Sequence, residues 1–357
     1  RIIDMTLSTD SDGHEWQCID FLGADVHYCR TKKTFRLSME TYIDKMQEKF
    51  KIDVGKPVYS PSFDEAVFHQ EGKPVPDFNL RAAVGCLQWI CTCGRPDVLV
   101  PVAVLARYVS LEPTLPMVKA VRKVMKYLIT TRTEGVTYSP ESEKAFEEIY
   151  GSLLPEGRAI PKINLFSDAS FANNLKSFKS TSGSSIWFRG TIIGWRSTVQ
   201  TVRAYSTAES EFIGASDTLI LSEQTNYLDF FKMPPDRMVQ PHNGVVCQDD
   251  DTILWLDNQS AICTAKLASE GETLPKSRHY ALRYLRVADF IKGNIKSIIY
   301  CPTNLMKSDP LTKTTVSIEQ RKLLLHNIVP SKDTLDPVDP EDDFVGVGYY
   351  YSVYLGF

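Results

Sequence analysis

Two predicted strands that each end in an aspartate constrain the fold more than any other feature of the sequence. They are residues 163–168 (INLFSD) and 252–257 (TILWLD), which end in Asp168 and Asp257. The second has an uninterrupted apolar middle, which predicts a central strand covered on both faces of its sheet. If the two strands are parallel neighbours, both carboxylates lie at the same edge of that sheet.

The elements around these strands predict a mixed α/β sheet flanked by helices. Residues 184–188 and 191–195 flank Arg189 and Gly190, which predicts a β-hairpin. Predicted helices follow at residues 206–221, 258–268 and 278–291, and a last strand is predicted at 295–300. The second of these helices has a suitable cap in Asn258. Strands and helices in this order indicate a mixed α/β fold class.

The chain before residue 161 is predicted to be mostly helical. Strand-like runs occur at residues 18–22 and 35–37, and a helix is predicted at 39–50. Residues 80–131 have helical spacing with breaks at Pro96 and around Pro113 and Pro116. The predicted division of the chain is residues 1–56, a linker at 57–79, a helical region at 80–135, a second linker at 136–160, an α/β domain at 161–328 and a tail at 329–357.

Carboxylates gathered at one sheet edge repel each other unless a divalent cation neutralises them. Oxygen ligands suit magnesium or manganese, and a pair of such ions catalyses phosphoryl transfer. The structural alternative is that each aspartate is only a turn or cap residue, which is the commoner case for a single strand-ending aspartate. In the following helix, Glu209 and Glu211 both flank the apolar face, so periodicity leaves the choice between them open.

Six short motifs follow one another along this part of the chain: FSDAS at 166–170, KSTSG at 179–183, IGW at 193–195, STAESEFIGA at 206–215, LDNQSAI at 256–262 and SDPLTK at 308–313. This series resembles the ribonuclease H domain that ends the Pol polyprotein of copia-type long-terminal-repeat retrotransposons. Both their order and their spacing match the family pattern. The sequence departs from that pattern at several positions, such as Phe171, where the family has tryptophan.

The resemblance implies an RNase H-like mixed sheet that carries a quartet of catalytic, metal-binding carboxylates. The four positions are Asp168, Glu211, Asp257 and Asp309. Such a quartet would bind two Mg²⁺ (or Mn²⁺) ions and cleave the RNA strand of an RNA/DNA hybrid, leaving a 3′-hydroxyl and a 5′-phosphate. RNA would be selected through 2′-hydroxyl contacts in the minor groove. Residues proposed to contact nucleic acid in this domain are Lys179, Arg278, His279 and Arg283, although His279 is equally well explained as a packing residue.

Motifs before residue 100 resemble the end of the polymerase palm, the thumb and the connection of the same Pol proteins. They are FLGA at 21–24, LSMETYIDKM at 37–46, AVGCLQW at 83–89 and GRPD at 94–97. The chain has no Tyr-x-Asp-Asp motif, so we do not expect it to polymerise DNA by itself. In the helix predicted for residues 116–131, Lys119, Arg122 and Lys126 share one face, which either contacts a duplex backbone or is only a solvated face.

Composition leaves the compartment and the partner open. No apolar run is long enough to span a membrane and no secretory signal is present, so we expect an intracellular protein of the cytoplasm, nucleus or an organelle. The net charge of −4 implies that any binding of nucleic acid uses local basic patches. Because Arg1 is not an initiator methionine, we expect a processed precursor or further residues upstream.

Two functions fit these observations. The first is a retroelement Pol fragment with an active ribonuclease H, which the complete quartet favours. The second is a domesticated, non-catalytic subunit that uses the fold as a scaffold, which the missing palm and the acidic balance favour. An aromatic, apolar segment at 345–357 follows an acidic stretch, and we expect this tail to dock on the chain itself or in a larger protein or ribonucleoprotein assembly.

Overall fold

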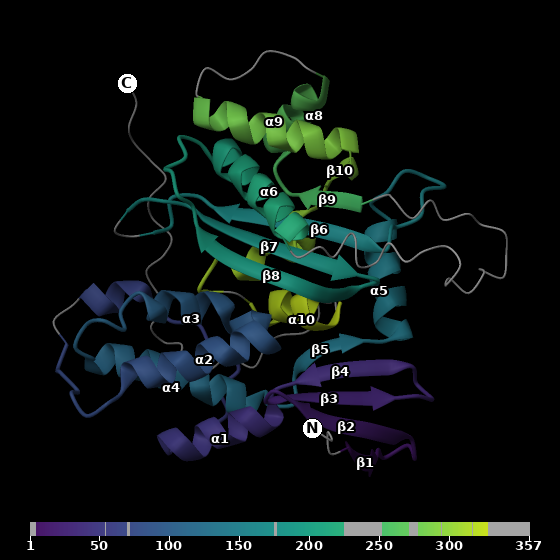
Figure 1. Ribbon diagram of the computed structural model, residues 1–357. Helices are drawn as coiled ribbons and strands as arrows, with labels where there is room; N and C mark the ends of the chain where they lie inside the picture. Colours follow the sequence, from purple (N-terminus) through teal and green to yellow (C-terminus); the bar gives the residue numbers. More distant parts are fainter. Residues whose placement is uncertain are drawn as a thin grey trace.

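In the computed structural model, the described part of the chain folds around two five-stranded β-sheets. Figure 1 shows how the two sheets are arranged. The structure describes residues 5–53, 55–69, 72–174, 177–224, 252–270, 278–293, 295–315 and 317–327. The tail at 329–357, for which docking was expected, lies outside these residues. In the part of the chain that is described, no helix is both long and apolar enough to cross a membrane.

The first sheet is antiparallel throughout, with the strand order β1-β2-β3-β4-β5. Its strands are β1 (Met5–Thr9), β2 (Glu15–Phe21), β3 (Ala24–Cys29), β4 (Thr34–Ser38) and β5 (Gly135–Tyr138). The runs predicted at 18–22 and 35–37 lie in β2 and β4. The other three strands were not predicted, although the sequences of β1 (MTLST) and β3 (ADVHYC) alternate between apolar and polar residues.

Helices make up most of the chain between β4 and β5, as predicted. They are α1 (Glu40–Phe50), the short 3-10 helix η1 (Glu65–His69), α2 (Leu80–Cys93), η2 (Pro96–Val98), α3 (Leu99–Ala106) and α4 (Leu115–Thr130). The side chain of Asn79 accepts a hydrogen bond from the Ala82 amide and begins α2. The predicted breaks at Pro96 and around Pro116 are confirmed: each proline lies in the first turn of a new helix. A proline is tolerated there but not in the interior of a helix.

Residues 136–160, which were expected to be a linker, instead contain β5 and the helix α5 (Pro140–Gly151). This helix buries Phe146 and Tyr150 completely. Their rings lie 6.2 and 5.1 Å from that of Phe166, on the second sheet. The two aromatic residues of α5 lie four positions apart and form one buried face of the helix.

The second sheet is mixed, with the strand order β10-β9-β6-β7-β8. Its strands are β6 (Ile163–Ser170), β7 (Thr181–Phe188), β8 (Thr191–Val199), β9 (Thr252–Leu256) and β10 (Ile295–Tyr300). The strands β6, β7 and β8 are antiparallel, whereas β9 runs parallel to both β6 and β10. This is the mixed sheet that the motifs imply, and the predicted hairpin around Arg189 is confirmed.

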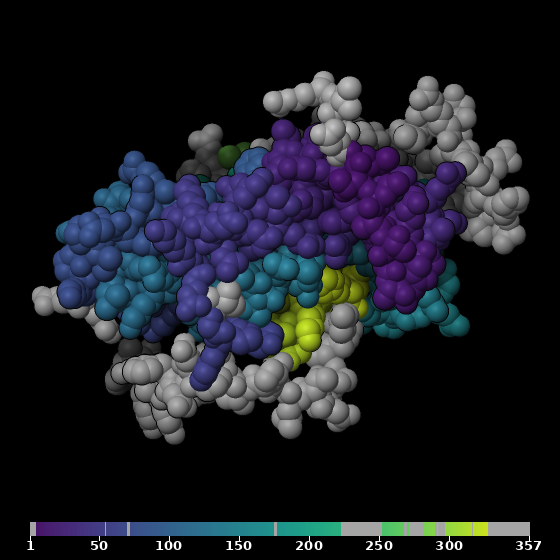
Figure 2. Space-filling model, turned by 90° about the horizontal axis from the view of Figure 1, so that it is seen from below, coloured from purple at the N-terminus to yellow at the C-terminus, as the bar shows by residue number. Residues whose placement is uncertain are grey.

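Both faces of the second sheet are covered (Figure 1). The helices α6 (Thr207–Gln224), α8 (Gln259–Glu270) and α9 (Arg278–Gly293) pack on one face, where Leu165 and Leu254 meet Phe212. The opposite face packs on α5, α10 (Ile318–His326) and the N-terminal part. Seen from that side, purple and blue N-terminal residues spread across the molecule, and yellow residues near α10 reach the surface beside them (Figure 2).

A buried lysine connects α10, the last described helix, to the second sheet. The Lys307 side chain is fully buried, and its Nζ donates a hydrogen bond of 2.7 Å to the Leu323 carbonyl oxygen of α10. The same atom lies 3.9 Å from the centroid of the Trp187 ring, and burial lowers the pKa of this amine. Lys307 therefore joins α10 to the lower face of the sheet.

Candidate functional site

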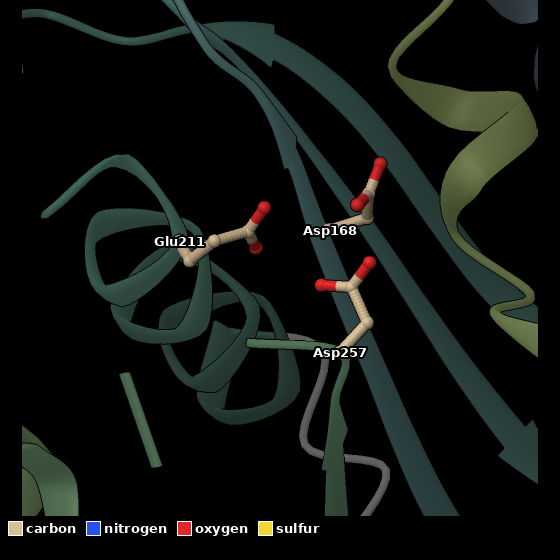
Figure 3. Close-up of side chains that lie close together, drawn as sticks. All are labelled: Asp168, Glu211 and Asp257. Atoms are coloured by element: carbon tan, nitrogen blue, oxygen red, sulfur yellow. The ribbon is translucent and has the colours of Figure 1, made fainter. Parts of the chain in front are cut away.

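Three carboxylates from three different elements meet at one edge of the second sheet. The side chains of Asp168, Glu211 and Asp257 each offer an oxygen atom that lies within 4.8 Å of the other two. Figure 3 shows the three groups pointing toward a common space. We call them the carboxylate triad.

The parallel pairing of β6 with β9 brings the two aspartates together. The register of these strands places Phe166 beside Trp255, so Asp168 and Asp257 follow at the same end of the sheet. Asp168 is buried two residues before the end of β6, while Asp257 is partly exposed just after β9. The expectation that parallel neighbours carry both carboxylates to one edge is confirmed.

Glu211 completes the triad from helix α6. Its Oε1 accepts a hydrogen bond of 3.2 Å from the Ala169 amide, next to Asp168. Its Oε2 is buried and has no hydrogen-bond partner among the residues that the structure describes. An unpartnered carboxylate oxygen in a buried site is costly, so this atom is a ligand position that fits a cation. Glu209, the other candidate, instead accepts a hydrogen bond from the Tyr205 amide at the start of the helix.

Two threonine hydroxyls hold the aspartates in place. The hydroxyl of Thr312 donates a 2.5 Å hydrogen bond to Oδ2 of Asp168. The hydroxyl of Thr303 donates a 3.2 Å hydrogen bond to Oδ2 of Asp257. Neither threonine was predicted to belong to the site, although Thr312 lies inside the SDPLTK motif, which was the available signal.

Asp309, the fourth predicted ligand, is buried beside the triad but is not one of its three clustered members. It begins the short 3-10 helix η5 (Asp309–Leu311). One of its carboxylate oxygens accepts a hydrogen bond from Lys313, and the other accepts one of 2.6 Å from Gln320. Its negative charge nevertheless contributes to the raised pKa values of Asp168 and Asp257.

A glycine allows η5 to lie directly on the sheet. A Cβ atom at Gly183 of β7 would be 2.6 Å from the Thr312 side chain and 2.8 Å from the Ser308 carbonyl oxygen. No other residue type fits this space without moving the backbone. The glycine of the KSTSG motif therefore determines where Thr312 meets Asp168.

Burial and mutual repulsion make the triad a poor place for uncompensated negative charge. Burial, together with the charge of Asp309, raises the pKa of Asp168 to about 7. Burial and the charges of Asp168 and Asp257 raise the pKa of Glu211 to about 10. The pKa of Asp257 is raised as well, chiefly by burial. Such a set of oxygen ligands is stabilised by a divalent cation.

The residues predicted to contact nucleic acid are spread over the molecule. Lys119, Arg122 and Lys126 lie on α4, which packs among the N-terminal helices. Arg283 of α9 donates a 2.8 Å hydrogen bond to Asp217 of α6, so its charge is already paired. Lys179 precedes β7 and lies near the triad edge. Arg278 and His279 begin α9, but their side chains lie outside the described residues.

No protein-family model matches the chain. The chain is 25% identical over 300 residues to the retrovirus-related Pol polyprotein from transposon TNT 1-94 of Nicotiana tabacum, with 82% of this chain and 20% of that protein covered. It is 29% identical over 136 residues to secreted RxLR effector protein 161 of Plasmopara viticola, with 38% of this chain and 83% of that protein covered. The chain thus spans about a fifth of the length of the tobacco polyprotein.

Pol polyproteins of tobacco, thale cress and budding yeast transposons, at 21% to 25% identity, match most of the chain. Among solved structures, the chain is similar to the N-terminal RNase H domain of a Mycobacterium tuberculosis protein, solved as a fusion with maltose-binding protein. That similarity covers 43% of this chain and 91% of the other, with 10% sequence identity and a TM-score of 0.29.

Proposed function

Since its homologues are retrotransposon Pol polyproteins, we propose that this chain is a Pol fragment of the copia type with an active ribonuclease H. The catalytic site is the carboxylate triad with Asp309 beside it, and the substrate is the RNA strand of an RNA/DNA hybrid. The cofactor is Mg²⁺, with Mn²⁺ as a substitute. Residues 1–56 end the palm and begin the thumb, 80–135 form the rest of the thumb and the connection, and 161–328 are the nuclease domain.

The observation that carries this proposal is the buried, unpartnered Oε2 of Glu211 inside the triad. A structural role would have left each carboxylate paired with a donor, as Asp97 is paired elsewhere in the chain. Carboxylate oxygens from three elements are the ligands that magnesium prefers, and no sulfur or imidazole ligand is part of the cluster.

In this proposal, each residue of the site has a definite task. Asp168, Glu211 and Asp257 would hold the metal, which when bound would supply activation of water and stabilisation of the leaving oxygen. Thr312 and Thr303 fix the rotamers of the two aspartates through the hydrogen bonds described above. Lys313 and Gln320 hold Asp309 at the margin of the site. Lys179, Arg278, His279 and Arg283 of this domain, and the cations of α4, remain candidates for contacts to the nucleic acid.

The test is cleavage of a labelled RNA/DNA hybrid by the full chain in magnesium and, separately, in manganese. We expect cleavage of the RNA strand by the unmodified chain and none by an Asp257→Asn variant, because the amide removes a ligand charge from the triad. A matched control is Asp289→Asn, which changes an exposed aspartate of α9 in the same domain and should leave cleavage unchanged. Absence of cleavage in both metals would leave the domesticated scaffold as the better function.

Magnesium should stabilise the chain, and more strongly at high pH. The pKa values of Asp168 and Glu211 are raised in the folded chain, so these groups stabilise the metal-free fold fully only below about pH 4. This stabilisation is lost as the pH rises toward 7 and beyond. Magnesium displaces the remaining protons and binds better as the pH rises. At pH 8 and a magnesium concentration of about a hundred times Kd, we expect the free energy of unfolding to increase by roughly 3 kcal/mol and the Tm by about 5 °C.

Thermal unfolding monitored at pH 5.5 and pH 8, with and without magnesium, measures this difference. Calcium and sodium at matched ionic strength separate specific binding from screening. An equal effect of magnesium at both pH values would contradict metal binding by the triad.

A further inference from the structure

Exposed aromatic residues gather at the same edge of the second sheet as the triad. Between Ile163 and Gln224, the described large apolar side chains that are exposed all lie on the loop from β6 to β7 or the loop from β8 to α6. These side chains are Phe171, Phe178, Val202 and Tyr205. We call Phe178 and Tyr205, which are 65% and 94% exposed, the aromatic rim.

The two loops leave the sheet together and are joined to each other. Thr181 is paired both with Ser170 and with Val199, so β6 and β8 end beside the start of β7. Figure 1 draws both loops, in teal, beyond that end of the sheet. Two 2.7 Å hydrogen bonds join them: Arg203 donates to the Ser177 carbonyl oxygen, and Lys179 donates to that of Thr201.

Each loop is also fastened to the triad. The side chain of Asn173 donates a hydrogen bond to the carbonyl oxygen of Thr312, whose hydroxyl holds Asp168. On the other loop, Gln200 donates a 2.9 Å hydrogen bond to the Ser210 carbonyl oxygen, one residue before Glu211. A ligand bound at the triad would therefore extend over or beside the aromatic rim.

The two side chains of the aromatic rim contribute little to the stability of the fold. Phe178 has a φ of +53°, the left-handed region that a bulky side chain rarely adopts. Its ring remains exposed, so no burial offsets this strain. Among the described residues, the hydroxyl of Tyr205 has no hydrogen-bond partner, and neither ring packs against another aromatic ring. The two exposed rings beside the triad therefore form a surface that a ligand can contact.

The charge of the loops indicates which ligand fits. The described residues of these two loops carry the cations Lys179 and Arg203 and no acidic residue, in a chain whose net charge is −4. The Glu209 carboxylate of α6 is held on the backbone amide of Tyr205. Cations beside exposed aromatic rings are the features that bind single-stranded nucleic acid, because phosphates meet the cations and bases stack on the rings. A duplex hides the faces of its bases, so the rings select bases that are unpaired.

We propose that Phe178 and Tyr205 stack against unpaired bases of a single strand that continues from the hybrid bound at the triad. This inference rests on the proposed ribonuclease H function, which it deepens by naming the form of substrate that the site prefers: a hybrid with a single-stranded extension. Lys179 and Arg203 keep the two loops together and supply positive charge along the path of the strand.

The experiment compares two fluorescent hybrids of the same sequence, one blunt and one with a single-stranded overhang of about 10 nucleotides. Binding is measured by anisotropy with the full chain carrying Asp257→Asn, so that the substrate is not consumed. We expect the overhang to improve affinity by about tenfold. The Phe178→Ala/Tyr205→Ala variant should lose this advantage while its affinity for the blunt hybrid stays within about twofold.

Two further variants make the result specific. Phe21→Ala/Tyr59→Ala removes two exposed aromatic side chains elsewhere in the chain and should keep the overhang advantage. Phe178→Trp/Tyr205→Phe keeps the stacking surfaces and should keep it as well. Circular dichroism and Tm verify that each variant is folded.

Equal binding of the two hybrids by the Asp257→Asn chain would overturn the inference, because no single strand would then be recognised. An equal loss of affinity for both hybrids in the alanine variant would also overturn the inference, because the rings would then contact the duplex or support the fold. A failure of the proposed function is distinguishable: cleavage would be absent for both hybrids in the unmodified chain, whatever their difference in binding.

Discussion

Replacing Glu211 with glutamine should lower hybrid cleavage by roughly a thousandfold while raising the Tm of the metal-free chain at pH 8. The fall in activity follows from the loss of a charged metal ligand, which supplies several kcal/mol of transition-state stabilisation. The gain in stability has a separate cause. Burial and neighbouring carboxylates raise the pKa of Glu211 to about 10, so the folded chain at pH 8 holds a proton that the unfolded chain releases.

The sign of this second effect can be tested by changing the pH. Glutamine cannot ionise, so the variant avoids the difference in proton binding, and its advantage in Tm should shrink as the pH falls toward the ordinary pKa of a glutamate. Glu209→Gln is a matched control on the same helix, because Glu209 bonds only to the backbone at the helix start. An unchanged metal-free Tm for Glu211→Gln, with cleavage retained, would remove Glu211 from the site.

Replacing Asp97 with asparagine should destabilise the fold by about 3 to 5 kcal/mol. Asp97 and Arg95 are both fully buried and form a two-pronged ion pair at 2.8 and 2.9 Å. Arg95 also donates to the Thr131 carbonyl oxygen, and Tyr127 donates a 2.6 Å hydrogen bond to Asp97. Although burial alone would raise the pKa of Asp97, Arg95 lowers it below its usual value, so the carboxylate is ionised. The asparagine variant would leave a buried guanidinium without its counter-charge.

Urea unfolding of the full chain measures this loss. Asp44→Asn is the control, because its ion pair with Arg132 is half exposed and should contribute no more than about 1 kcal/mol. A double variant, Arg95→Met/Asp97→Leu, removes both charges and should recover much of the stability. If Asp97→Asn unfolded at the same urea concentration as Asp44→Asn, the buried pair would have no structural role.

The second sheet was largely predictable because its strands carry local signals. The apolar middle of β9, the hairpin around Arg189 and the terminal aspartates of β6 and β9 are all contained in short stretches of sequence. The first sheet and α5 have weaker signals. The strand β1 is exposed along its whole length, and the burial of Phe146 depends on Phe166 and Trp187, which lie far along the chain. The spacing of residues within α5 or β1 does not identify such distant partners.

The candidate site was also only partly predictable from the sequence. The edge position of Asp168 and Asp257 followed from strand-end chemistry, whereas the choice of Glu211 over Glu209 needed either the family motif or the geometry of α6. The hydrogen bonds of Asp309 to Lys313 and Gln320 could not be anticipated, because they depend on how η5 and α10 pack against each other.

The buried face of the second sheet joins the two halves of the chain in one core. Phe166, Trp187 and Trp255 are buried in one continuous core with the N-terminal helices and α5. Cutting the chain before residue 161 would expose these rings to water and remove the partners on which they depend. Recombination that transferred only the segment with the triad would therefore separate this site from part of the core that supports its sheet. Selection should keep the two halves of the chain together as one transferable unit.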